Sequence, residues 1–125
     1  MKMKYGYKIE DWDLAKAEVK DLLIQRAKLR GMMPYSELTT KVRTIELEPN
    51  SQALAAMLGQ VSEEEDDAGR GLLTVIVVHK VGDMQPGPGF FELAKKRGRN
   101  PSDILKCWID ELKKVHGAWA TTSRC

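Results

Sequence analysis

The sequence predicts a helix-rich α+β fold in a single domain spanning residues 1–125. Apolar residues recur at helical spacing through most of the chain. One segment, 72–78, is instead a nearly continuous run of leucine, valine and isoleucine, which is typical of a buried strand. A length of 125 residues and a hydrophobic fraction of 42% are ordinary for one folded domain.

The first expected helix covers residues 11–30. Its apolar positions, from Trp12 to Ala27, recur every three or four residues. Acidic residues lie at its start and basic residues at its end, which complements the helix dipole. Gly31 follows as the residue that ends the last turn.

Two further helices are expected in the first half of the chain. A short one covers residues 33–39, because Pro34 is compatible with a first helical turn. The other covers residues 51–65 and is capped by Asn50 or Ser51, with an apolar face at spacings of three and four residues. Five consecutive acidic residues, 63–67, are expected to fray into solvent, since negative charge is unfavourable at the end of a helix.

The buried strand at 72–78 is expected to belong to a small hairpin or wing, because the Gly/Pro-rich segment 85–89 cannot form regular structure. A short helix then covers 90–97. The last helix is expected to begin at Asn100 and Pro101. Its apolar stripe is the clearest in the sequence and comprises Leu105, Trp108, Ile109, Leu112, Val115 and Trp119.

Charge and cysteine content narrow the possible functions. The net charge is only +2, so nucleic-acid or lipid binding requires a local basic patch. Residues 86–125 hold eight basic and four acidic residues, a local net charge of +4. Cys107 and Cys125 do not make a disulfide framework. The sequence lacks a signal-peptide pattern and a run long enough to span a bilayer, so a cytoplasmic location without membrane contact is expected.

Two helices, a turn, a buried strand and a Gly/Pro-rich return outline a winged helix-turn-helix. Residues 35–38 and 52–59 resemble the paired helices of the DNA-binding domain in alkylguanine-type DNA repair proteins, and of similar domains in bacterial restriction or mobile-element proteins. The resemblance covers about residues 33–91, and Leu73–Val78 takes the place of that family's active-site strand. Where those enzymes carry Pro-Cys-His-Arg, this chain reads Val77-Val78-His79-Lys80. The resemblance therefore implies the binding scaffold without the alkyl-transfer chemistry.

This reading predicts a non-catalytic module that binds nucleic acid, DNA rather than RNA, without a cofactor or metal. The third helix would be the recognition helix, with Gln52, Ala56, Gly59 and Gln60 on its outward face. The cations in 95–99 would bind phosphates, or would simply be solvated at a helix end. The expected binding residues, with the basic ones on one face beside the start of the third helix, are Tyr35, Ser36, Lys41, Arg43, Ser51, Gln52, Lys80, Lys95, Lys96, Arg97 and Arg99.

Two alternatives remain open at this point. The chain could be a homo-oligomeric interaction or adaptor protein, if the tryptophans of the last helix form a dimer contact rather than part of the core. It could also be a small enzyme, with His79 as a base oriented by Asp83. A lone histidine after a strand is more often an ordinary turn residue, and no second catalytic partner is apparent in the sequence.

Overall fold

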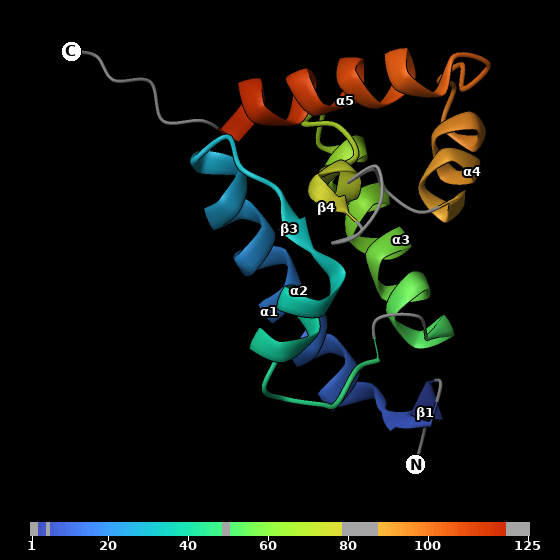
Figure 1. Ribbon diagram of the computed structural model, residues 1–125. Coiled ribbons are helices and arrows are strands. Elements are labelled where there is room, and N and C mark those ends of the chain that lie inside the picture. Colours follow the sequence, from blue (N-terminus) through green and yellow to red (C-terminus); the bar gives the residue numbers. More distant parts are fainter. Residues whose placement is uncertain (1–2, 5, 49–50, 79–87, 120–125) are drawn as a thin grey trace.

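The computed structural model describes residues 3–4, 6–48, 51–78 and 88–119. In Figure 1, α3 (Gln52–Asp67) lies between α1 (Ile9–Lys28) and α4 (Pro88–Lys96), and α5 (Ile104–Trp119) crosses the end of the molecule where α3 finishes. The short helix α2 (Tyr35–Lys41) lies in front of α1 in this view. Buried side chains from these helices form one apolar cluster. The expected helix-rich α+β class is confirmed.

The described strands are short and do not form the expected buried hairpin. Strands β1 (Met3–Lys4) and β2 (Tyr7–Lys8) pair antiparallel at the start of the chain. Strand β3 (Met33–Pro34) pairs with β4 (Val77–Val78), and this pair is parallel. Parallel strands cannot be joined by a tight turn, so β3 and β4 are not a hairpin. Residues 79–87, including Lys80 and the Gly/Pro-rich return, lie outside the described residues.

The prediction of a strand over residues 72–78 was wrong for most of its length. Residues Leu73–Ile76 form a 3₁₀ turn, and only Val77 and Val78 are extended in the ladder. The backbone N–H of Thr74 donates to the Ser62 hydroxyl at 3.1 Å, and the hydroxyls of these two residues are 2.6 Å apart. The tight turn and a side chain of α3 thus satisfy backbone groups that a strand would pair with a neighbour. The composition indicated burial correctly but not conformation.

Helix α1 forms as expected and buries one face against the core, through Trp12, Ala15, Val19, Leu23 and Ala27. The Trp12 indole N–H donates to the Gln60 side-chain oxygen at 3.1 Å, which ties α1 to α3. The helix ends at Lys28, and the N–H groups of the next three residues bond back to carbonyls of its last turn.

Arg30 is a non-glycine residue in the left-handed region, with φ of 55°, and it closes the end of α1. This conformation costs an ordinary residue about 1 kcal/mol relative to glycine. Arg30→Gly is therefore expected to raise the free energy of unfolding by about 0.5–1 kcal/mol, measured by urea denaturation. Arg30→Ala is the control, since it removes the same side chain but keeps the strain. An equal gain from alanine would contradict the explanation.

Helix α3 continues to Asp67, so the expected fraying of residues 63–67 was wrong. Its acidic end is neutralised by arginines from elsewhere in the fold. The buried carboxylate of Glu65 binds Arg70 through two hydrogen bonds of 2.8 Å, and Lys20 of α1 lies 3.3 Å from it. These cations lower the pKa of Glu65, with the Arg70 hydrogen bonds as the main cause. Paired in this way, the acidic turn stays helical despite the dipole.

Helix α5 begins at Ile104 rather than at Pro101. The Asn100 side chain accepts the Ser102 N–H in the turn before the helix, and Asp103 caps α5 by accepting the Lys106 N–H. The buried face of α5 also differs from the expected stripe. Leu105 is 51% exposed. The buried residues of α5 are Cys107, Glu111, Val115 and His116.

The tryptophans of α5 pack against the chain's own core, which favours the core interpretation over a dimer contact made by them. The Trp108 indole donates to the Val75 carbonyl at 3.3 Å. The guanidinium of Arg70 lies over the ring of Trp119, 5.0 Å from its centroid. Cys107 is a free, buried thiol. No helix in the described part of the chain is both long and apolar enough to cross a membrane.

Candidate nucleic-acid interface

The expected binding residues at the starts of α2 and α3 have different roles in the structure. Ser51 caps α3, because its hydroxyl accepts the Leu54 N–H at 3.2 Å and donates to the Glu48 carbonyl at 2.9 Å. Gln52 and Ser36 are exposed, whereas Tyr35 is half-buried against the core. Of these four side chains, only Gln52 and Ser36 are exposed to solvent. Ser51 has a structural role as the cap of α3.

Lys41 and Arg43 are both exposed beside the C-terminal end of α2. The Lys41 ammonium lies 3.9 Å from a Glu37 oxygen, a weak surface pair. The backbone N–H groups of Arg43 and Thr44 donate to the two oxygens of Glu18, which fastens this loop to α1. Hydrogen bonds from Thr44 and Arg43, together with the Arg43 charge, lower the pKa of Glu18. The Arg43 side chain itself stays in solvent.

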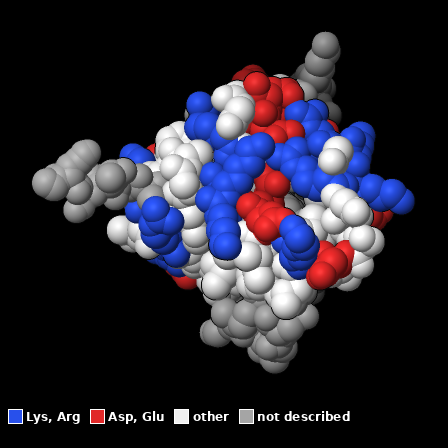
Figure 2. Space-filling view, turned by 90° about the horizontal axis from the view of Figure 1, so that it is seen from above, with Lys and Arg blue, Asp and Glu red and all other residues white. Residues whose placement is uncertain are grey.

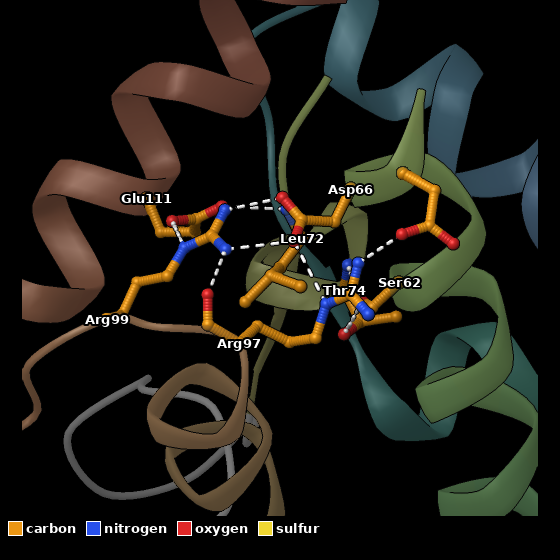
Figure 3. Close-up of polar contacts among 8 residues, drawn as sticks. Ser62, Asp66, Leu72, Thr74, Arg97, Arg99 and Glu111 are labelled. Carbon is orange, nitrogen blue, oxygen red and sulfur yellow. Dashed lines mark hydrogen bonds and ion pairs between the residues drawn. The ribbon is translucent and has the colours of Figure 1, made fainter. Parts of the chain in front are cut away.

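Arg97 and Arg99, expected to bind phosphates, are instead held by carboxylates of the protein. Arg97 pairs with Asp66 at 3.1 Å and also with Asp67. Arg99 donates to both oxygens of Asp66, at 2.9 and 2.7 Å, and to both oxygens of Glu111, at 2.9 and 3.0 Å. Its side chain is only 19% exposed. Figure 3 shows this guanidinium between the two carboxylates.

Glu111 joins α5 to the segment that follows α3. Its side chain is 4% exposed, and besides Arg99 it accepts the backbone N–H of Leu72 at 2.7 Å. Gly71, with φ of 91°, lies directly beneath it, and a Cβ at that position would come within 3.0 Å of the carboxylate. Glycine is needed here for both the backbone conformation and the space. Asp66, Arg99 and Glu111, which we call the arginine clamp, thus connect α3 and α5 to the loop that follows α4.

The electrostatics of the arginine clamp follow from this geometry. Hydrogen bonds from Arg99 and then Arg97 lower the pKa of Asp66 from 3.8 to about 2. The same bonds to Asp66 and Glu111 raise the pKa of Arg99 above its already high ordinary value. The four cations of 95–99 therefore divide into two kinds. The arginines are neutralised within the protein, and the lysines are not.

Exposed lysines gather over α4 and α5. Figure 2 looks down on the end of the molecule that α5 crosses, and cationic side chains cover more of this face than acidic ones. Lys95 and Lys96 lie in the last turn of α4. Lys106 pairs with Asp110 at 2.8 Å. Four other lysines on these helices are exposed, and we call them the lysine surface: Lys95, Lys96, Lys113 and Lys114. Among the described residues, none of these four forms an ion pair.

The structure does not gather the expected binding residues on one face. Arg97 and Arg99 bind the last turn of α3, whereas Ser51 and Gln52 lie at its start. Fifteen residues of α-helix separate these ends by about 22 Å. In Figure 1 the end of α4 lies beside α5, while α2 and the start of α3 lie towards the opposite end of the molecule. The expectation of a single face beside the start of α3 was therefore wrong.

Helix α3 also lacks most of the outward face expected of a recognition helix. Gln60 is half-buried and bonded to Trp12, and Ala56 packs against the core. The helix contacts α1, α4 and the 3₁₀ turn. A helix covered on three sides cannot enter a DNA groove along its length, although its first turn is accessible.

Sequence reasoning missed the arginine clamp, although two signals for it were present. The acidic run 63–67 and the basic segment 95–99 are blocks of opposite charge that could satisfy each other. Glu111 follows Trp108 by three residues and precedes Val115 by four, which places a carboxylate on the buried face of α5. A carboxylate among apolar positions indicates a buried partner, because an unpaired buried charge is very costly.

The enzyme alternative depends on His79 and Asp83, which lie outside the described residues, so it stays a prediction. Within the described ranges, histidine, cysteine and acidic residues form no cluster that could hold a metal ion. Burial raises the pKa of the Cys107 thiol, which keeps it protonated and unreactive. No protein-family model, curated protein or solved structure matches the chain, and the resemblance to alkylguanine-type repair domains stays a prediction from its residues.

Proposed function

We propose that the protein binds nucleic acid, most favourably duplex DNA, through the lysine surface on α4 and α5. The observation that carries this proposal is that the arginines and the lysines in the basic third of the chain have different surroundings. Arg97 and Arg99 are paired with Asp66, Asp67 and Glu111, whereas Lys95, Lys96, Lys113 and Lys114 are exposed and form no ion pair among the described residues.

Lysine ammonium groups on flexible stems bind phosphates as point charges rather than through fixed bidentate geometry. Such contacts release counterions and provide affinity without sequence information. We therefore propose sequence-independent, salt-sensitive binding, in contrast to base reading by α3. Gln52 and Ser36, at the opposite end of the molecule, are not required by this mechanism.

Replacing the four residues of the lysine surface by glutamine is expected to abolish most of the affinity for a random duplex. Each phosphate contact contributes about 0.9 to the slope of log K against log salt concentration, so the slope should shrink by roughly three to four units. Fluorescence anisotropy of a labelled duplex, titrated at several salt concentrations, measures both quantities.

The matched control is the double variant Lys41→Gln and Arg43→Gln, which removes two exposed cations near the opposite end. It should leave the affinity and the salt slope nearly unchanged. If this control weakens binding and the quadruple variant does not, the helix-turn-helix interpretation replaces the lysine surface. Absence of binding by the wild type at low salt, where the electrostatic contribution is largest, would reject both.

A further inference from the structure

The outward face of α5 carries a carboxylate among its lysines. Lys106, Asp110, Lys113 and Lys114 are all exposed. Asp110 follows Lys106 by four residues and precedes the other two lysines by three and four, so the four side chains lie on one side of the helix. Figure 2 looks down on this end of the molecule and shows acidic side chains between cationic ones. A duplex held by the lysine surface therefore lies close to the Asp110 carboxylate.

Asp110 pairs with one of these three lysines. Its Oδ2 atom lies 2.8 Å from the Nζ atom of Lys106, and the two side chains are 59% and 71% exposed. The hydrogen bond to Asp110 raises the pKa of Lys106. Among the described residues, Lys113 and Lys114 form no ion pair. The charge of Lys106 is thus balanced within the helix, whereas the charges of Lys113 and Lys114 are available to a ligand.

The pair between Asp110 and Lys106 opposes phosphate binding whether it stays closed or opens. If Lys106 stays with Asp110, the duplex is held by the four residues of the lysine surface alone. Exposed pairs at this spacing are weak, so a phosphate can also displace the carboxylate. Asp110 is then left unpaired beside the phosphates, and like charges repel. In both cases the carboxylate lowers the affinity for a duplex.

We propose that Asp110 limits the affinity of the lysine surface by holding Lys106 away from the bound phosphates. The inference rests on the nucleic-acid binding proposed above. It makes Lys106 a fifth phosphate ligand that the wild-type protein does not use. The complex is therefore expected to dissociate faster than the number of exposed lysines predicts, since affinity differences within one interface are mostly differences in dissociation rate.

Replacing the carboxylate should release Lys106. The Asp110→Asn variant keeps the shape of the side chain but cannot form the ion pair. One additional phosphate contact steepens the slope of log K against log salt concentration by about 0.9. At 0.1 M salt this corresponds to an affinity about eightfold higher than that of the wild type. Fluorescence anisotropy of a labelled random duplex, titrated at several salt concentrations, measures both quantities.

Lys106→Gln, made in two backgrounds, tests whether this gain depends on Lys106. In the wild type it should leave the slope unchanged, because Lys106 makes no phosphate contact. Combined with Asp110→Asn, it should remove both the steeper slope and the eightfold gain. Glu92→Gln is the matched control, since it removes an exposed carboxylate of α4 that forms no ion pair among the described residues. Its slope should equal that of the wild type, and circular dichroism confirms that every variant is folded.

Three results would overturn the inference while leaving the proposed function in place. A lower slope for Lys106→Gln alone would show that Lys106 already binds phosphate in the wild type. A gain that persists when Lys106→Gln is added to Asp110→Asn would show that Asp110 acts only by repulsion. An Asp110→Asn slope equal to that of the wild type would show that no contact is added. Absence of duplex binding by both the wild type and Asp110→Asn at low salt would reject the proposed function and this inference together.

Discussion

Arg99→Ala is expected to lower the free energy of unfolding by about 3 kcal/mol, because it leaves two poorly exposed carboxylates without their cation. The side chains of Asp66 and Glu111 are 12% and 4% exposed. Arg97 remains beside Asp66 and the Leu72 N–H remains on Glu111, so the loss falls at the lower end of the range for breaking a buried ion pair. Urea denaturation followed by circular dichroism gives the value, provided that the m-value is unchanged.

Lys96→Ala is the matched control for this variant. It removes a cation from the same segment, but from an exposed side chain without a described ion pair. Its effect on stability should stay within about 0.5 kcal/mol. If Arg99→Ala costs no more than Lys96→Ala, then Arg99 is not a structural residue and its role as a phosphate ligand reopens.

Stability is expected to fall in acid as Asp66 takes up a proton. Its pKa is lowered from 3.8 to about 2 in the folded protein, chiefly by Arg99. A lowered pKa means that the contribution is fully present above the unfolded value and disappears as the pH falls through the folded value. The contribution is on the order of 2 kcal/mol and is lost progressively between about pH 5 and about pH 1. Glu65, Glu37 and Glu18 also have lowered pKa values and act in the same direction.

Asp66→Asn separates this residue from the other carboxylates. The variant should be less stable than the wild type at neutral pH, because the amide cannot form the ion pair with Arg99. As the pH falls through the same range, the difference between the two proteins should shrink. Chemical denaturation at a series of pH values measures it. A difference that stays constant down to about pH 2 would show that Asp66 is not held by the arginines.

The elements that could be predicted from the sequence are those that local pattern determines. The apolar period from Trp12 to Ala27 predicts α1 almost completely. The prediction that Gly31 closes its last turn was wrong, because Arg30 adopts the left-handed conformation there. The apolar face of α3, from Leu54 to Val61, can likewise be predicted from the spacing of neighbouring residues alone. The run 72–78 was misjudged because β-branched composition reports burial as much as conformation. Here the hydroxyl of Ser62 and a tight turn replace strand pairing.

The arginine clamp could not be derived in the same way, because it depends on contacts between segments far apart in the chain. Arg99 meets Asp66 across 33 residues, and no local period encodes that distance. Considered alone, the basic segment 95–99 had two equally good interpretations. Only the position of the acidic turn of α3 decides between them for the arginines, and it leaves Lys95 and Lys96 available to a ligand.

The most direct test of the lysine surface is nuclear magnetic resonance of the ¹⁵N-labelled protein titrated with a short random duplex at low salt. The proposal predicts that amide shifts gather in the last turn of α4 and on the exposed side of α5, around Lys95, Lys96, Lys113 and Lys114. It predicts little change around Ser36, Arg43 and Gln52. Shifts gathered at those three residues instead, or no shifts at all, would contradict it.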